Sequence, residues 1–258
     1  MIKSRLLYLH ISLLVLFACQ PSPKEAETLT PTRTTIIDSL KHPWSMVFLS
    51  EEEVIVSEKD GDLLRINLST KERHSITGFP EDLVDSIRVK DGRDNSGIFE
   101  VVLHPDFQQN QQIYVSYAAE AEGGSTTKVV RASLENDSLE EVSVILLAQP
   151  YSRDIFQNGG GMTFGSDGKL YVTVGERYYN EIAQPDLPVA QDIQDRRGKV
   201  YRLNPNGSIP VDNPEMGNEA IPGMYAMGIR AAQGSTLQPE SGAIWFTEHG
   251  SFQGDEIN

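Results

Sequence analysis

The stretch from Gly159 to Arg177 constrains the fold most, because it contains a complete β-hairpin signal. Two apolar segments, Met162–Phe164 and Leu170–Val174, flank the turn tripeptide Ser166-Asp167-Gly168. Aspartate side chains bond the backbone in turns and glycine tolerates positive φ, so the tripeptide favours a tight connection. Apolar and more polar side chains alternate in the second segment, as in a strand with two distinct faces. The stretch predicts two antiparallel strands, and its terminal glycines allow a ligand or another strand to approach closely.

Similar strand signals recur on both sides of this hairpin. A first group has runs at 44–49, 54–58, 63–68 and 74–77, and a second has runs at 97–103, 112–117, 127–134 and 142–147. The third group combines the hairpin with Gly198–Leu203, after an insertion from Tyr178 to Arg197. A fourth group starts at Met224 and includes Ala243–Thr247. Each group repeats strand, turn with glycine or aspartate, and strand, which predicts a series of small sheets.

The spacing of these groups favours a β-propeller. Equivalent positions in the first strands, Phe48, Leu103, Phe164 and Leu237, stand 55, 61 and 73 residues apart. Four-stranded units at intervals near or somewhat above 50 residues are typical of propeller blades. A β-sandwich with coincidental spacing is the alternative. The sequence therefore predicts an all-β fold, with about four blades in this chain.

The N-terminus has the features of a secretion signal. Lys3 and Arg5 precede an apolar run from Leu6 to Ala18, shorter than the roughly 20 residues that span a bilayer. The run ends in Leu16-Phe-Ala-Cys19, which resembles a bacterial lipobox, and Cys19 is the sole cysteine of the chain. We expect a lipoprotein signal peptide over residues 1–18, a flexible tether over 19–36 rich in Pro, Thr, Glu and Ser, and a folded domain over 37–258.

The charge excludes one class of partner. Acidic residues number 37 against 22 basic ones, a formal net charge of −15, and the folded part has no Lys/Arg cluster. Nucleic acid is therefore not an expected partner. The acidity suits a solvated surface or, alternatively, a site for hard cations. The loop from Glu248 to Glu256 offers three carboxylates and flexible backbone carbonyls, the oxygen ligands that calcium prefers, although the spacing is not that of an EF-hand.

Other polar residues point less clearly to chemistry. His104-Pro-Asp-Phe107 stands between two strands, where proline and aspartate organise a turn, so we interpret it as structural. His42 and His74 have no carboxylate or histidine at metal-ligand spacing, and no serine or cysteine nucleophile constellation stands out. Arg230, in a glycine-rich loop before a strand, is either an anion clamp or an ordinary surface charge.

Five segments taken together resemble the soluble quinoprotein glucose/sorbosone (aldose sugar) dehydrogenases: 42–48, 97–107, 170–177, 198–214 and 250–258. The resemblance extends over nearly everything from residue 37 onward, and the segment 198–214 is its most specific part. It implies a six-bladed propeller, pyrroloquinoline quinone (PQQ) bound at the end of the central channel, calcium, and oxidation of the C1 hydroxyl of an aldose to a lactone. Because the chain ends inside the fourth blade, we expect an open arc whose two uncovered sheet faces favour self-association.

The resemblance also implies roles for individual residues around the quinone. Arg230 stands where the family has an arginine beside the quinone, and Asn95 where a cofactor-contacting glutamine is usual. The family histidine that acts as base and an arginine four residues later are replaced by Gln157 and Gly161, and a cofactor-contacting asparagine is replaced by Ala231. A glutamine amide has no usable basicity near pH 7, so Gln157 is not expected to act as a base.

The calcium ligands implied by the resemblance lie at the end of the chain. Gly250 and Ser251 stand where the family uses backbone carbonyls for the calcium of the cofactor. Asp255 and Glu256 match acidic calcium ligands of the same loop.

Two functions follow as alternatives. The first is PQQ-dependent oxidation of aldose sugars at C1, with doubtful activity in this chain because its catalytic histidine and C-terminal blades are missing. The second is a non-catalytic propeller of the cell envelope that binds a carbohydrate or protein partner. For both functions we expect a lipoprotein of the bacterial envelope that faces the periplasm or the cell surface. Its lipid anchor would be its only contact with the membrane. The ligand of the dehydrogenase would be a small sugar.

The anchor is testable by one substitution. Cys19→Ala should release the protein from membranes, because it removes the thiol to which the lipid would be attached. Stable anchoring needs more than one acyl chain, so multiple acylation at Cys19 is expected. Detergent phase separation measures the distribution, and a wild-type protein found wholly in the aqueous phase would contradict the assignment.

Overall fold

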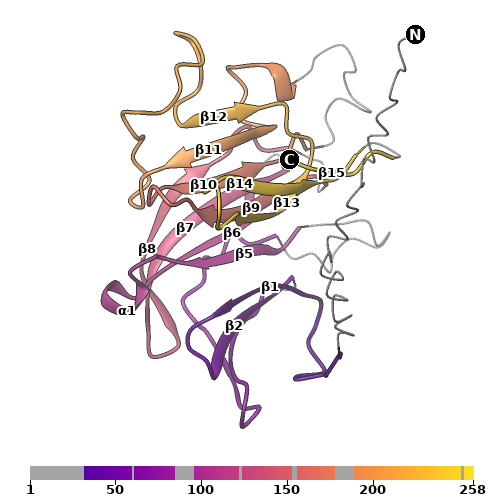
Figure 1. The fold of residues 1–258 in the computed structure, drawn as a ribbon, viewed down its shortest axis with the longest axis vertical. Helices are drawn as coiled ribbons and strands as arrows, with labels where there is room; N and C mark the ends of the chain where they lie inside the picture. Colours follow the sequence, from indigo (N-terminus) through magenta and orange to yellow (C-terminus); the bar gives the residue numbers. More distant parts are fainter. Residues whose placement is uncertain are drawn as a thin grey trace, which may run out of the picture. The chain divides into compact units, whose positions relative to one another are not determined.

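The computed structural model describes residues 32–59, 61–84, 96–121, 124–152, 156–177, 189–250 and 253–258. Residues 36–258 form one compact unit, separate from residues 1–35. This unit is almost entirely β, with one helical turn, α1 (Phe107–Asn110), and a short 3-10 turn, η2 (Val189–Gln191) (Figure 1). Within the described ranges, no helix is long and apolar enough to span a bilayer. Cys19, Asn95 and Ser251 lie outside the described residues.

In the described ranges, fifteen strands form four antiparallel sheets, and each sheet takes its strands in chain order. The first sheet contains β1 (Pro43–Phe48), β2 (Glu53–Glu58), β3 (Leu63–Asn67) and β4 (Arg73–Ser75). The second contains β5 (Ile98–Leu103), β6 (Gln112–Ala121), β7 (Gly124–Glu135) and β8 (Ser138–Leu147). The third contains β9 (Gly159–Phe164), β10 (Leu170–Val174), β11 (Lys199–Leu203) and β12 (Met224–Met227). The fourth contains β13 (Ala232–Leu237), β14 (Ile244–Glu248) and β15 (Glu256–Ile257).

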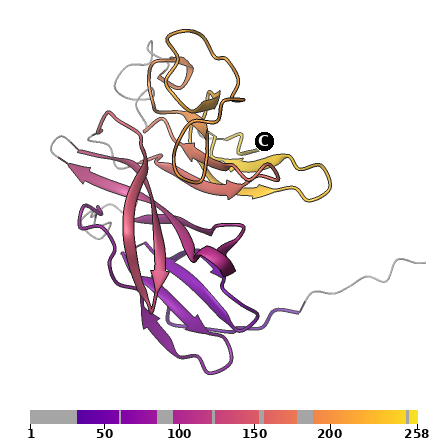
Figure 2. The same cartoon turned by 90° about the vertical axis from the view of Figure 1, so that its left-hand side faces the viewer.

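The sheets stack through their first strands. β1 contacts β5, β5 contacts β9, and β9 contacts β13, so the sheets follow one another in chain order (Figures 1 and 2). A meander of small sheets with adjacent first strands is the arrangement of propeller blades. The structure confirms the prediction of an all-β propeller fold with four blades in this chain.

One predicted boundary is wrong. Met224 was expected to open the fourth unit, but β12 is the outermost strand of the third sheet, and Tyr201 of β11 pairs with Met224. The connection from β11 to β12 is a long loop, so sequence distance separates strands that are neighbours in space. The fourth sheet instead begins at Ala232.

Each gap between sheets is filled by side chains from both. The first cluster, between the first two sheets, includes Ile55 and Val101, and the second, between the next two, includes Tyr114 and Met162. The third includes Tyr171 and Ala232, with Ile244 and Phe246 of β14 packed against it. Burial of these apolar faces is the main favourable term that holds the sheets together.

In each of the first three sheets, a hydroxyl on the second strand bonds the next sheet. Ser57 Oγ donates to Phe99 O at 3.2 Å, Ser116 Oγ to Gly160 O at 2.5 Å, and Thr173 Oγ1 to Ala232 O at 2.8 Å. All three hydroxyls belong to buried residues, and all three accepting carbonyls belong to the innermost strand of the following sheet. Each of these bonds gives a buried backbone carbonyl a hydrogen-bond partner. Irregular pairing between the strands would otherwise leave these carbonyls without one.

The ladder is disturbed at equivalent places. The pairing register between first and second strands shifts at Pro43/Ser45 in the first sheet, Ile98/Val101 in the second and Ala232/Ser235 in the fourth. The third sheet has its shift at Val172/Val174. The linking hydroxyls also bond the irregular strand of their own sheet, since Ser57 Oγ accepts from Ser45 N and Ser116 Oγ from Glu100 N, both at 3.0 Å. Each irregularity therefore frees backbone groups that a serine or threonine takes up.

Glu100 is a carboxyl group held between the first two sheets. Ser45 Oγ donates to Glu100 Oε1 at 2.5 Å and accepts from Val101 N at 3.2 Å. Burial raises the pKa of Glu100 to about 7, although the Ser45 hydrogen bond opposes the shift. The folded protein therefore binds this proton more tightly than the unfolded chain does.

Stability should accordingly fall as pH rises from about 4.5 to about 7, because a raised carboxyl pKa contributes stability that is lost as the group ionises. The change is on the order of 3 kcal/mol at most, from 1.36 kcal/mol per pKa unit. Glu100→Gln should flatten this part of the profile, measured by urea unfolding at pH 4.5 and 7.5. Glu53→Gln is the control, because the hydrogen bond from Arg65 lowers the pKa of Glu53 and gives the opposite sign. Equal pH profiles for wild type and Glu100→Gln would contradict the assignment.

Candidate functional site

Several buried polar residues gather where β9 and β13 begin and where β10 and β14 end. Gln157 lies just before β9 with φ +50° and is 8% exposed. Its backbone oxygen accepts from Arg177 N at 3.3 Å. Gly175 passes between Gln157 and Arg230, because a Cβ atom at Gly175 would lie 1.9 Å from Gln157 O and 3.0 Å from Arg230 O. The backbone at 175 thus brings the segments of Gln157 and Arg230 close together.

Arg230 is held by two neighbouring segments, at Glu176 and at Glu248–His249. Its carbonyl accepts from Glu176 N at 2.9 Å, and its N–H donates to Glu248 Oε1 at 2.5 Å. The guanidinium Nη1 donates to His249 O at 3.0 Å and is partly exposed. Glu176 is 5% exposed, so a buried carboxyl group lies on the segment that leaves β10.

The other described cations of this end are buried. Arg177 is 1% exposed; its Nε donates to Phe156 O at 3.1 Å and its Nη2 to Ser125 Oγ at 2.9 Å. Arg197 forms a two-point ion pair with Asp195, with Nη2 to Oδ2 at 2.6 Å. Burial alone would raise the pKa of Asp195, but the bonds from Arg197 hold it below its usual value. These partners fix the framework around Gln157.

Lys199 is a buried amine next to this framework. Nζ donates to the carbonyl oxygens of Val189, Ala190 and Arg197 at 3.0, 3.2 and 2.6 Å. Burial lowers the pKa of Lys199 to about 8, against the attraction of Asp195. The three carbonyls account for the donors of an ammonium ion, so Lys199 anchors η2 to β11. Apart from the position of Lys199 in the segment 198–214, no sequence pattern indicates this role.

The predicted calcium loop is partly described. Gly250 N donates to Asp255 Oδ1 at 2.9 Å, and Glu248 and Glu256 are direct cross-strand partners. Asn258 Nδ2 bonds Glu248 Oε2 at 3.3 Å and Glu256 Oε2 at 3.4 Å, so one amide lies beside both carboxylates. Glu248, Asp255 and Glu256 line a hollow of about 240 Å³ together with Thr247, His249 and Ile257.

The donor set suits a hard cation only in part. Within the described ranges, no three His, Cys, Asp or Glu side chains converge as a metal-binding group. Asp255 and Glu256 are exposed, and Asp255 is used to close the loop on Gly250. Two facing carboxylates and the nearby backbone are the described candidates, and calcium binding stays a prediction.

Position 161 cannot hold the arginine found at that place in the family. A Cβ atom at Gly161 would lie 2.4 Å from Gln233 O, so β9 and β13 would have to separate. Gln233 Oε1 in turn contacts His249 Nε2 at 3.0 Å. At position 161 the strands β9 and β13 therefore pack too closely to leave room for an arginine side chain. His249 beside Arg230 is a polar group that the sequence did not single out.

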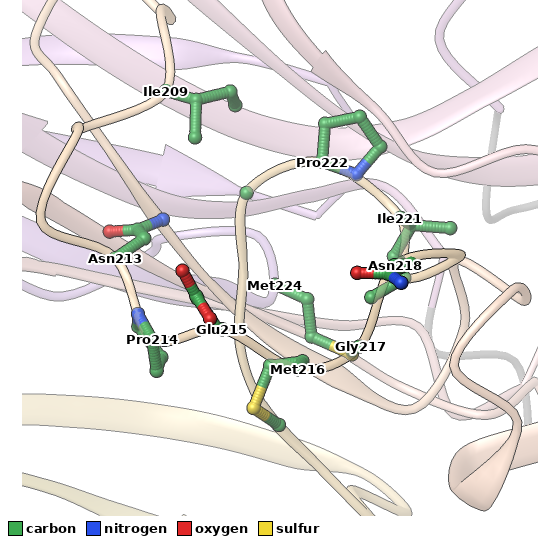
Figure 3. A pocket seen from close by; sticks show the side chains of 12 residues that line it. Ile209, Asn213, Pro214, Glu215, Met216, Gly217, Asn218, Ile221, Pro222 and Met224 are labelled. Atoms are coloured by element: carbon green, nitrogen blue, oxygen red, sulfur yellow. The ribbon is translucent and has the colours of Figure 1, made fainter.

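A second hollow, of about 520 Å³, is lined by the loop between β11 and β12 (Figure 3). Its lining includes Glu215, Met216, Asn218 and Met224, and Glu215 and Asn218 lie on opposite sides of it. The first half of this loop, up to residue 214, belongs to the most specific segment of the family resemblance, and its conformation depends on one arginine.

That arginine is Arg202. Its Nη2 donates to Asp167 Oδ2 at 2.8 Å and to Asp212 Oδ2 at 2.9 Å, and its Nη1 to Asn213 Oδ1 at 2.8 Å. Burial would raise the pKa of Asp167, but a backbone bond and Arg202 hold it below its usual value. The arginine connects the turn of the β9–β10 hairpin to the long loop, so the motif has a structural role.

Comparison with known proteins identifies the class. The sequence profile described as Glucose / Sorbosone dehydrogenase matches residues 40–258. The chain is 30% identical over 252 residues to the aldose sugar dehydrogenase YliI of Escherichia coli, which covers 95% of this chain and 63% of that protein. It is 29% identical over 247 residues to quinoprotein glucose dehydrogenase B of Acinetobacter calcoaceticus, which covers 88% of this chain and 50% of that protein.

Solved structures agree with this assignment. A crystal structure of glucose dehydrogenase superposes with a TM-score of 0.77 at 33% identity, over 88% of this chain and 63% of that one. The fold and the matches place the molecule among propeller sugar dehydrogenases. The chain belongs to the glucose/sorbosone dehydrogenase family. It spans about half to two thirds of the length of these relatives.

Because Gly175 lies against two backbone carbonyls, we expect a single added methyl group there to destabilise the protein strongly. Gly175→Ala should destabilise the protein by more than Gly168→Ala, because the added Cβ meets backbone atoms that cannot rotate away. At Gly168, with φ +70° and nothing near the Cβ position, the cost is the conformational one of about 1–2 kcal/mol. Urea unfolding of both variants measures the difference, and equal losses would show that 175 tolerates a side chain.

Proposed function

We propose that this chain provides the part of a PQQ-dependent aldose dehydrogenase site that lies around Gln157, Glu176 and Arg230. Family membership supports the class of reaction, and one relative is described as a quinoprotein. The observation that carries the placement is the backbone contact of three segments at Gly175, the segments that hold Gln157, Glu176 and Arg230. Oxidation of the C1 hydroxyl to a lactone is the proposed chemistry.

The side chains suit a quinone that carries carboxylates. Arg177, Arg197 and Lys199 are nearly fully buried, whereas the guanidinium of Arg230 is partly exposed and oriented by His249 O. Arg230 can therefore meet an anionic group at the surface of this end. When bound, PQQ supplies a quinone carbonyl carbon that accepts the hydride from C1 of the sugar. The loop of Gly250, Asp255 and Glu256 is the proposed calcium site beside it.

The weakness of the site is the missing base. The hydroxyl at C1 must give up a proton as the hydride leaves, and Gln157 stands where the family has histidine. Its amide can orient a sugar hydroxyl through hydrogen bonds but cannot take the proton. Loss of a positioned base costs on the order of 10² to 10⁴ in rate. We propose that this chain binds a sugar at Gln157 and oxidises it slowly.

A non-catalytic role is the second candidate, favoured by the same amide. Gln157 and Glu176 lie on neighbouring segments, and an amide and a carboxyl group are the hydrogen-bonding groups that sugar hydroxyls need. Such a protein would bind a carbohydrate without oxidising it, as a lipoprotein that faces the periplasm or the cell surface. Titration calorimetry with aldoses, with and without PQQ and calcium, separates binding from turnover.

Dye reduction with a panel of aldoses, after reconstitution with PQQ and calcium, tests the role of position 157. The wild type should turn over slowly, and Gln157→His should raise the rate by at least about tenfold because imidazole can accept the proton. Gln157→Asn, which keeps a neutral amide, is the matched control and should stay slow. Rapid wild-type turnover that histidine does not improve would contradict the proposal, and loss of that turnover in Glu176→Gln would identify the unrecognised base.

A further inference from the structure

A third hollow, of about 460 Å³, lies where two connections that lead into the third sheet meet. One wall is the segment 149–151, between β8 and β9, and the other is the segment 194–196, between η2 and β11. The third sheet has a neighbouring sheet on each side, so the hollow does not depend on the outer faces of the first and fourth sheets. The lining residues are Gln149, Pro150, Tyr151, Gln194, Asp195 and Arg196.

Hydrogen bonds tie both walls to the candidate functional site. Ser152 follows the first wall and exchanges two backbone bonds with Ser125 of β7, at 2.9 and 2.7 Å. Ser125 Oγ in turn accepts from Arg177 Nη2 at 2.9 Å. Beyond the second wall, Gly198 N donates to Gly175 O at 3.1 Å. The hollow therefore borders the segment of the candidate site that leaves β10.

The hollow has one guanidinium that no carboxylate neutralises. Asp195 is paired with Arg197, which leaves the half-buried Arg196 as the cation of the lining. The backbone of Arg196 is held by Tyr201, whose hydroxyl donates to Arg196 O at 2.7 Å. Within the described ranges, no salt bridge involves the Arg196 guanidinium. In a chain with a net charge of −15, such a group is available to a carboxylate from outside.

The uncharged groups of the lining suit a sugar ring. Tyr151 is half-buried, and its hydroxyl has no hydrogen-bond partner in the part of the chain that the structure describes. Gln149 contributes an exposed amide, and Gln194 a second one that is held by Glu219, with Nε2 to Oε2 at 2.8 Å. An aromatic ring packs on the apolar face of a sugar, and amides bond its hydroxyls. Together with one guanidinium, these groups match a sugar that carries a carboxylate.

We propose that this hollow binds an acidic sugar residue of the uronic acid class. Its carboxylate bonds the Arg196 guanidinium, its ring packs on Tyr151, and Gln149 and Gln194 bond its hydroxyls. In a longer saccharide, the next sugar lies toward the segment that leaves β10, where the proposed oxidation takes place. This extension rests on the proposed function, whereas binding of the acidic sugar in the hollow does not.

Titration of the full chain with methyl β-D-glucuronide and methyl β-D-glucoside, followed by NMR of the ligand without PQQ, tests the proposal. The two probes differ only in the carboxylate or hydroxymethyl group at C6, and neither has a free C1 hydroxyl. The result is therefore independent of whether the chain oxidises aldoses. The glucuronide should bind at least about tenfold more tightly, because it alone can pair with Arg196. Equal affinities for the two probes would overturn the proposal.

Variants locate the bound glucuronide. Arg196→Met should weaken its binding at least about tenfold, and Arg196→Lys less, because an ammonium keeps the charge without the planar fork. Arg131→Met, at a half-buried arginine of β7 outside the lining, is the matched control and should bind like the wild type. Thermal melting checks that each variant is folded.

Two further measurements separate the hollow from other anion sites. Arg230→Met should leave glucuronide binding unchanged, and a loss there without a loss in Arg196→Met would place the ligand at the candidate functional site and overturn the proposal. Tyr151→Leu should weaken binding of the glucuronide, because it removes the aromatic ring. Sodium acetate should compete poorly, since it lacks the sugar ring. Displacement by acetate at concentrations equal to those of the glucuronide would show that any carboxylate binds, and would overturn the assignment to a sugar.

Discussion

The structure depends on contacts between sheets, and each contact combines an apolar gap with one hydroxyl-to-carbonyl bond. No single sheet of three or four strands buries enough surface to be stable alone, so each one needs a neighbour. The bonds from Ser57, Ser116 and Thr173 fix how the sheets sit along each other, since each hydroxyl must reach one carbonyl of the next first strand. Burial of the apolar clusters supplies most of the favourable free energy of the contacts between sheets. The hydroxyl bonds set the position of each sheet along its neighbour.

This arrangement also forms the site. The stacked first strands bring the starts of β9 and β13 together, and the absence of a side chain at Gly175 and Gly161 lets three segments approach within contact distance. Gln157, Glu176 and Arg230 are far apart in sequence, yet two backbone bonds connect the segments that hold them. The proposed chemistry there is hydrogen bonding and anion binding, with Gln157 at the position where the resemblance implies a histidine.

Local signals in the sequence predicted much of the fold. The hairpin strand Leu170–Val174 has the predicted bounds, because its alternation and its turn are both encoded within a few residues. The assignment of Met224 to the fourth unit was wrong because its partner, β11, precedes it by a long loop that carries no periodicity. The linking hydroxyls were not recognised, since a serine in a strand gives no sign of a bond to a residue some 40 positions away. The register irregularities that explain them are equally non-local.

For the candidate site, the family resemblance indicated individual residues more readily than the chemistry of the side chains did. Arg230 and Gln157 were identified by motif, and the structure places their segments on either side of Gly175. His249 and Lys199 were missed as individual residues, because their roles depend on Gln233 and on the carbonyls of η2. These partners come close only in the folded arrangement of stacked sheets, so they cannot be predicted from local sequence.

Equilibrium binding of PQQ, followed by absorbance with calcium present, tests most directly whether this end of the sheets is the quinone site. Arg230→Met should weaken binding at least about tenfold, because it removes the exposed guanidinium that would face an anionic cofactor. Lys169→Met removes a cation at the opposite end of β10, where Lys169 bonds Asn204, and should leave binding unchanged. Equal affinities for the two variants and the wild type would contradict the account.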